Sequence, residues 1–219
     1  MVLTIAGSDT TAATLLAIIY HVLSDESIFT RLRKELETAM PDPGEPPVPS
    51  ELDRLPFLNA LIEETLRMYP TVVSRQDRVA PSQDLVYQHE DGRTVLLPAG
   101  TIIGMTSPLL NRHPSWISDP ETFNPDRYIV DPQLMRRHLT FSKGGRICLG
   151  INLAYQELQS FTAGLFRKYG RYDRNLERQN GPTLELYQTT SRDIELYSDF
   201  VTAHTYPGSE GVRVRVRHR

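Results

Sequence analysis

The residue types around Cys148 indicate thiol chemistry. Cys148 is the only cysteine in a chain of 219 residues, so it cannot form an internal disulfide and either packs in the core or works as a thiol. Gly144 and Gly145 allow a tight bend before it, and Arg146 places a fixed positive charge two residues from it. Apolar residues recur at helical spacing from Ile151, so we expect the cysteine in a glycine-rich loop at a helix N-terminus. The free N–H groups and the helix dipole favour a thiolate there, which could attack a substrate or bind a metal.

The spacing around the cysteine bears on which role it has, because a lone cysteine is most often a buried packing residue. Here the stretch follows Phe-x-x-Gly-x-Arg-x-Cys-x-Gly, at Phe141, Gly144, Arg146, Cys148 and Gly150. This pattern resembles the haem-ligand loop of the cytochrome P450 family. The resemblance implies that Cys148 is the thiolate ligand of a haem iron and that Arg146 pairs with a haem propionate. It also implies that Phe141 and Gly150 belong to the cofactor-binding loop.

A second candidate for chemistry is a polar run, 8–11, inside an apolar stretch. Gly7 within a helix costs about 1 kcal/mol relative to alanine, and buried Asp9 and Thr10 would need partners. One explanation is that Asp9 is the N-cap of a shorter helix that starts two residues later. The other is a distorted helix in which the Thr10 hydroxyl bonds back to the carbonyl of Ala6 and opens a groove beside Gly7. The segment resembles the oxygen-binding motif of the same family, which implies that Asp9 and Thr10 are catalytic residues that pass protons.

A charged pair lies in the next strongly apolar helix. Glu64 and Arg67 are three residues apart and can meet on one helix face, although surface pairs of this kind are common and contribute little. A further arginine, Arg127, follows in Phe-Asn-Pro-Asp-Arg-Tyr. The order and spacing resemble the family's Glu-Arg-Arg triad, which implies a buried charge cluster that locks the cysteine loop. Loss of one member would leave a buried charge without its partner.

Two arginines, Arg75 and Arg78, follow this helix, and the ordinary place for an arginine is the surface. In the family an arginine in this region pairs with a haem propionate. Arg78 is the closer match to that position, and Arg75 is the alternative. The chain departs from the family pattern at 111–114, where Asn-Arg-His-Pro stands in place of His-Arg-Asp-Pro. We therefore expect His113 to be a surface residue and not a ligand.

Helices and short strands must position these residues. Apolar periodicity predicts helices over residues 2–23, 25–40, 56–68 and 151–165. Turn signals and alternation predict a hairpin and further strands, at residues 85–87, 94–97, 101–105 and 212–217. Prolines make 41–49 a loop, and 108–140 is loop-rich. We expect a mainly α fold with small β-sheets. The resemblance implies the C-terminal half of the cytochrome P450 fold, with residues 1–219 as the C-terminal part of a single haem-thiolate domain.

Composition limits the classes of function. A net charge of −3 gives no electrostatic basis for nucleic-acid binding, and no zinc-ligand spacing such as His-Glu-x-x-His or Cys-x-x-Cys is present. The longest apolar run, 12–23, is shorter than the roughly 18 residues that a membrane span needs, so we expect no span. The chain starts with apolar, helical residues and no capping residue ahead of Val2, which favours a chain that lacks an upstream part.

The resemblance, to the eukaryotic, fungal-like microsomal type, implies a monooxygenase that inserts one oxygen atom from O2 into an apolar organic substrate. Its cofactor would be haem (iron protoporphyrin IX), and NADPH–cytochrome P450 reductase would supply electrons. A full-length relative would lie at the endoplasmic reticulum membrane, whereas this chain shows no anchor and its location is not assigned. Two alternatives stand beside this hypothesis. The chain could be a truncated non-catalytic fragment with weak or no haem binding, or a haem-thiolate protein with isomerase or peroxide chemistry, against which the Asp9–Thr10 pair argues.

Overall fold

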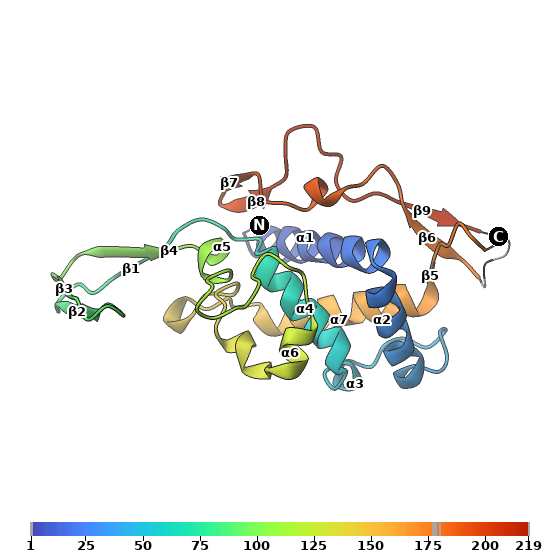
Figure 1. Cartoon of the computed structure of the whole chain (residues 1–219), viewed down its shortest axis with the longest axis horizontal. Helices are drawn as coiled ribbons and strands as arrows, with labels where there is room; N and C mark the ends of the chain where they lie inside the picture. The colour runs from blue at the N-terminus through green and yellow to red at the C-terminus, as the bar shows by residue number, and fades with distance from the viewer. Residues whose placement is uncertain (1, 177–178, 180, 219) are drawn as a thin grey trace.

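Four long helices form the body of the molecule in the computed structural model, which describes residues 2–176, 179 and 181–218 (Figure 1). They are α1 (Val2–Ser24), α2 (Glu26–Ala39), α4 (Pro56–Met68) and α7 (Ile151–Lys168). Shorter helices are α3 (Pro49–Leu52), α5 (Ser107–Leu110), α6 (Asp126–Val130) and the 3-10 turns η1 (Pro132–Arg136), η2 (Gly144–Arg146) and η3 (Ser191–Asp193). The predicted helices are confirmed, and so is the mainly α fold with small sheets.

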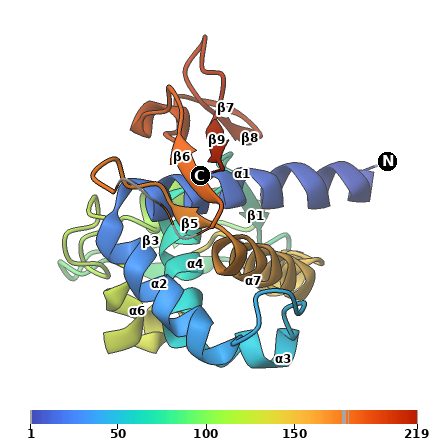
Figure 2. The ribbon, with the colours of Figure 1, turned by 90° about the vertical axis from the view of Figure 1, so that its right-hand side faces the viewer.

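Helix α1 does not begin at Asp9, so the alternative of an N-cap there is wrong. The helix runs unbroken from Val2, and hydroxyl side chains of the polar run bond to carbonyls one turn earlier. The Thr10 hydroxyl donates to the carbonyl of Ala6 (2.7 Å), as predicted, and the Ser8 hydroxyl donates in the same way to the carbonyl of Thr4 (2.8 Å). The N-terminal half projects beyond the other helices, as Figure 2 shows, and its described side chains are largely exposed. Only the later part of this helix enters the core.

Helix α2 shows how local sequence starts an element and tertiary packing keeps it. Its N-cap is Asp25, whose carboxylate accepts hydrogen bonds from the backbone N–H groups of Ser27 (2.8 Å) and Ile28 (3.3 Å). The buried face that follows, with Ile28, Leu32 and Leu36, has the spacing of an amphipathic helix. Burial of each such side chain contributes about 1.5–3 kcal/mol.

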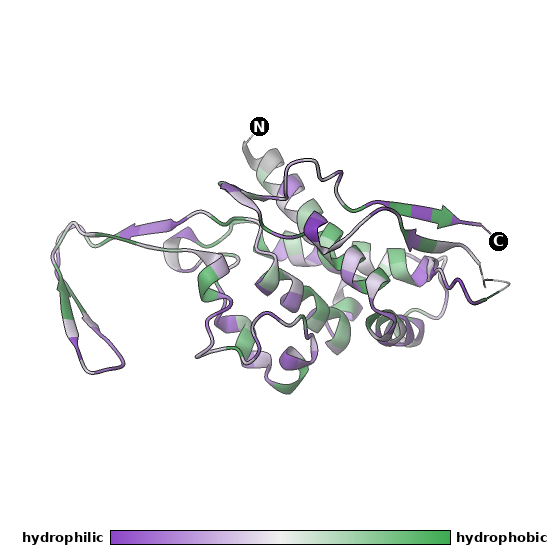
Figure 3. Ribbon diagram, turned by 45° about the horizontal axis from the view of Figure 1, so that its top comes forward, coloured by the Kyte–Doolittle hydropathy of each residue, from purple (hydrophilic) through white to green (hydrophobic). Residues whose placement is uncertain are grey.

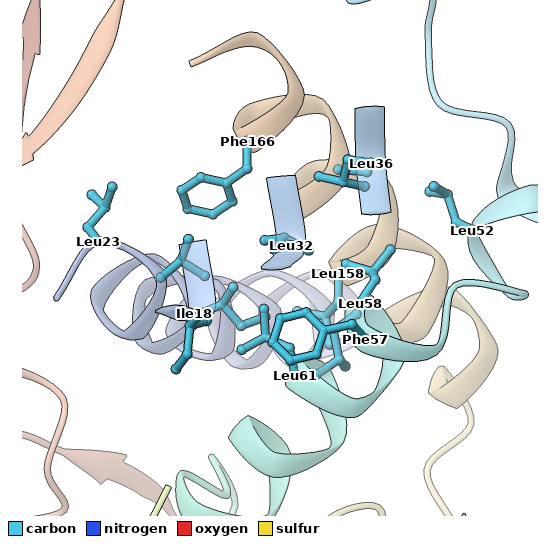
Figure 4. Packing of buried hydrophobic residues seen from close by; sticks show 14 of the residues in the cluster. Ile18, Leu23, Leu32, Leu36, Leu52, Phe57, Leu58, Leu61, Leu158 and Phe166 are labelled. Atoms are coloured by element: carbon cyan, nitrogen blue, oxygen red, sulfur yellow. The ribbon is translucent and has the colours of Figure 1, made fainter. Parts of the chain in front are cut away.

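The hydrophobic core lies where the four long helices meet (Figure 4). Each helix contributes fully buried side chains to it, among them Ile18, Leu32, Leu36, Leu58, Leu61, Leu158 and Phe166. Helices α4 and α7 both belong to this core. Its close packing therefore fixes the position of the residues on these helices that lie near the cysteine loop.

The sheets are small and lie at the edges of the helical body. Their strands are β1 (Gln76–Val79), β2 (Leu85–Gln88), β3 (Thr94–Leu97), β4 (Ile102–Met105), β5 (Gly170–Arg171), β6 (Thr183–Leu186), β7 (Ser198–Phe200), β8 (Thr202–His204) and β9 (Val214–Arg217). Antiparallel pairs form between β1 and β4, β2 and β3, and β7 and β8, while β6 lies between parallel β5 and antiparallel β9. The predicted hairpin is confirmed, with Gly92 at φ +85° in its turn. Figure 3 shows this hairpin reaching away from the helices.

The connections agree with the proline and glycine content. Residues 41–48 contain no helix or strand, and the segment 108–140 contains only short helical turns. In the ranges described, no single helix has the length and apolarity of a membrane span. Helices α1 (from Ala6) and α2 meet that criterion only together, with a bend of 106° between them.

Candidate functional site

Cys148 lies in an exposed loop between the η2 turn and the start of α7. Gly144 has φ +69°, a left-handed conformation that favours glycine, and it starts the turn. The N–H of Cys148 donates to the carbonyl of Phe141 (2.9 Å) and closes the loop. Gly150 is the N-cap residue of α7. The structure thus places the cysteine in a glycine-containing loop at a helix N-terminus.

A cavity of about 440 Å³ lies between α1 and this loop. Thr10, Arg78, Phe141, Arg146 and Cys148 all line it, although they come from distant parts of the chain. The rest of the lining is mostly small or apolar: Ala6, Thr11, Thr14, Leu66, Thr71, Val72, Gln76, Thr140, Ser142, Ala154 and Leu158. The cavity therefore combines an apolar wall, one sulfur and two guanidinium groups.

The two cavity arginines have no carboxylate within ion-pair distance in the part of the chain that the structure describes. Arg78 donates to the Ser142 hydroxyl (2.8 Å) and to the carbonyl of Asp77 (2.9 Å), both neutral groups. Arg75 differs, because it forms an ion pair with Asp77 (2.7 Å) and does not line the cavity. Positive charge beside an apolar cavity suits a large apolar ligand that carries carboxylates. With the thiol on the same wall, the donor set fits a thiolate-ligated haem and its two propionates.

Asp9 and Thr10, from the polar run in α1, lie on different sides of the helix. Thr10 lines the cavity, and its hydroxyl donates to the carbonyl of Ala6. Asp9 is exposed and is not part of the lining; its one side-chain contact among the described residues is a long hydrogen bond from Ser8 (3.5 Å). The structure brings Thr10 but not Asp9 to the site.

The three charged residues of the predicted triad lie together behind the loop. The Glu64 carboxylate accepts from Arg67 Nε (2.7 Å) and Nη2 (2.9 Å), from Arg127 Nε (3.1 Å) and from the N–H of Asn124 (2.7 Å). The side chains are 0%, 0% and 8% exposed for Arg67, Glu64 and Arg127. The remaining guanidinium donors bond to carbonyls of the 111–122 segment, including Pro120 (2.8 Å) and Ser118 (2.9 Å). The cluster therefore ties that segment to α4.

Sequence reasoning missed Asn111, which joins this cluster to the cysteine loop. Its amide nitrogen donates to the carbonyl of Arg67 (3.2 Å) and to the Thr140 hydroxyl (3.0 Å), and its oxygen accepts from the N–H of Leu139 (2.8 Å). Thr140 in turn donates to the carbonyl of Leu66 (2.8 Å). The departure from the family pattern at this position was the available signal. His113 is exposed, as expected for a surface residue.

A half-buried histidine connects α1 to the end of α4. His21 Nε2 lies 2.9 Å from the Tyr69 hydroxyl, and the His21 ring stacks on Phe123 with centroids 3.6 Å apart. Burial lowers the pKa of His21 to about 4 and raises the pKa of Tyr69 to about 12. Both side chains are neutral at pH 7, so this contact is structural.

Comparison with known proteins bears directly on this site. A sequence profile described as "Cytochrome P450" matches residues 1–180. The chain is 37% identical over 219 residues to cytochrome P450 monooxygenase astB of Talaromyces wortmannii, with 96% of this chain and 44% of that protein covered. It is 38% identical over 212 residues to cytochrome P450 monooxygenase tpcC of Cochliobolus heterostrophus (96% and 40% covered) and 34% identical over 214 residues to fusicoccadiene C-8 hydroxylase of Phomopsis amygdali (96% and 38%). The chain spans about two fifths of the length of these relatives.

Proposed function

This chain belongs to the cytochrome P450 family, and we propose that residues 1–219 are the C-terminal part of a haem-thiolate monooxygenase domain. The family implies a haem cofactor and generally uses a redox partner and apolar substrates. The proposed reaction is insertion of one oxygen atom from O2 into an apolar organic molecule, with electrons from NADPH–cytochrome P450 reductase. One observation carries the proposal: a single cavity is lined by Cys148, by two arginines without carboxylate partners among the described residues, and by Thr10 of α1.

We assign cofactor binding to the wall of the cavity that contains the thiol. Cys148 would be the iron ligand, presented by the loop that leads into α7. Arg78 and Arg146 would pair with the propionates, since a guanidinium can donate two parallel hydrogen bonds to a carboxylate. When bound, the haem supplies the oxidative chemistry, which a thiolate ligand supports by donating electron density to the iron. Phe141, which lines the cavity and packs on Tyr155 with ring centroids 5.4 Å apart, would support the loop from within.

Proton delivery is assigned to α1. We assign Thr10 the role of holding a proton at Oγ1 inside the cavity, which is supported by its position in the lining and its bond to the carbonyl of Ala6. Asp9 lies on the exposed surface of the same helix, so we assign it the exchange of protons with solvent. The apolar lining would exclude water and favour an apolar substrate.

The test is the absorption spectrum of the haem-loaded chain. Residues 1–219 are expressed with haem, and the reduced, CO-bound form is recorded. We expect a red-shifted, thiolate-type Soret band that disappears in Cys148→Ala. Arg78→Gln should weaken haem binding by about tenfold, the equivalent of one lost charge-assisted contact. Arg75→Gln is the matched control and should leave haem binding unchanged, because Arg75 pairs with Asp77 away from the cavity.

The alternative is a non-catalytic chain that binds haem weakly or not at all. One observation favours it: the side of the cysteine loop is open, with Ile147 51%, Leu149 89% and Leu153 56% exposed. Failure of the wild-type chain to take up haem would support this alternative. It would contradict the proposal that these residues form a working site by themselves.

A further inference from the structure

A second acidic side chain of α4 is buried beside Glu64. Glu63 is 3% exposed, and its carboxylate has two described partners. Oε1 accepts a hydrogen bond from the Tyr155 hydroxyl (2.8 Å), and Oε2 lies 2.9 Å from His138 Nε2. Within the described residues no lysine or arginine lies within ion-pair distance of it. A carboxylate is costly to bury unless its hydrogen bonds are satisfied, so these two partners explain how Glu63 is tolerated.

The two partners come from opposite ends of the cysteine loop. His138 lies on the segment that enters the loop, ahead of Phe141. Tyr155 lies near the start of α7, the helix that leaves the loop after Cys148. A single carboxylate on α4 therefore holds both ends of the segment that presents the thiol.

The surroundings of His138 fix which of its nitrogens carries the proton. His138 is 9% exposed, and its Nδ1 is buried without a hydrogen-bond partner in the described part of the chain. An N–H at that position would be a buried donor with no acceptor, which costs more than an unpaired lone pair. An N–H at Nε2 therefore donates to Glu63, so the carboxylate receives two hydrogen bonds.

We propose that Glu63 is a positioning residue for Cys148: it clamps the entry and the exit of the cysteine loop to α4 through His138 and Tyr155. This inference rests on the proposed function, which assigns Cys148 as the haem ligand. The order of the loop itself, however, can be measured without haem.

Limited digestion with trypsin measures that order in the full chain. The loop and its entry contain trypsin sites at Arg136, Arg137, Lys143 and Arg146, and Arg93 in the β2–β3 turn is an internal reference far from them. In Glu63→Gln we expect cleavage within 136–146 to be about tenfold faster than in wild type, because loss of one buried, charge-assisted contact increases local opening. Cleavage at Arg93 should be unchanged. Glu157→Gln, an exposed carboxylate on α7, is the matched control and should behave as wild type.

Three further variants separate positioning from general stability. Tyr155→Phe removes one of the two bonds and should give an intermediate acceleration; it also keeps the test available if Glu63→Gln does not fold. His138→Gln retains an N–H donor and should restore most of the protection that His138→Leu loses. In haem-loaded chains, Glu63→Gln should shift part of the thiolate-type Soret band to the position of a neutral thiol ligand.

Two results would overturn the inference: equal acceleration at Arg93 and in the loop, or unchanged loop cleavage in all of these variants. Absence of haem uptake by the wild-type chain would contradict a working haem site formed by residues 1–219 alone, and would leave the digestion result as an independent measure of loop positioning.

Discussion

Two arginine–carboxylate pairs in this chain have nearly the same geometry and very different surroundings, and we predict that they differ in their effect on stability. Arg67 donates to Glu64 at 2.7 and 2.9 Å, and Arg31 donates to Asp126 at 2.8 and 2.6 Å. The first pair has side chains 0% exposed, and the second has side chains 48% and 49% exposed. The change is removal of one negative charge from each pair, as Glu64→Gln and Asp126→Asn.

The expected magnitudes follow from burial and not from distance. Glu64→Gln leaves Arg67 and Arg127 buried without their anion, and removal of one member of a buried pair costs about 3–5 kcal/mol. It also places an amide N–H₂ against guanidinium donors that need acceptors. The Arg31 side chain is already 48% exposed, so water solvates its charge in Asp126→Asn. An exposed pair of this kind contributes about 0–1 kcal/mol.

Urea unfolding followed by circular dichroism at pH 7 measures both free energies of unfolding against wild type. Similar losses from the two variants, at either magnitude, would refute the argument that desolvation decides the strength of these pairs. A large loss in Asp126→Asn alone would mean that the helix-to-helix link through Arg31 matters more than the buried cluster.

Three more predictions concern local features. Because burial lowers the pKa of His21 from 6.5 to about 4, the unfolded chain binds more protons between these values. The stability due to neutral His21 is therefore complete above pH 6.5 and is lost as pH falls toward 4, by about 3 kcal/mol in all. In His21→Gln the urea midpoint should depend less on pH between 6.5 and 4. An unchanged pH dependence in this range would contradict the prediction. Gly144→Ala, at φ +69°, should cost about 1 kcal/mol in thermal unfolding, whereas Gly145→Ala should cost little. Asp25→Ala should destabilise by about 1 kcal/mol through loss of the α2 cap, and Asp9→Ala, inside an unbroken helix, should not.

Local signals in the sequence were sufficient for most of the fold. The Asp-Gly turn and the flanking alternation located the β2–β3 hairpin, and apolar periodicity located the long helices. The back-bond from Thr10 to Ala6 was also predictable, because donor and acceptor lie one turn apart. These features depend on neighbours in the chain and need no knowledge of the tertiary structure.

Long-range pairing was predicted only where the family resemblance gave it, as for Glu64 and Arg127, and other features of this kind could not be predicted. The partners of Glu63 are 75 and 92 residues away in the sequence. The choice between the two arginines after α4 depends on where β1 begins. Strand alternation places Gln76 and Arg78 on the cavity side and Asp77 on the other, where Arg75 pairs with it. A shift of one residue would exchange the two arginines.

The two walls of the cavity are hydrogen-bonded independently of each other. On the α1 wall, Thr10 bonds to Ala6 and Thr14 bonds to Thr10, all within one helix. On the loop wall, Thr140 bonds to α4 at Leu66. Through the described ranges, no side-chain hydrogen bond joins α1 to the loop. Substitutions on α1 can therefore reshape one wall while the thiol stays in place on the other. Under the proposed function, this separation would let the substrate wall vary without a change in the wall that holds the cofactor.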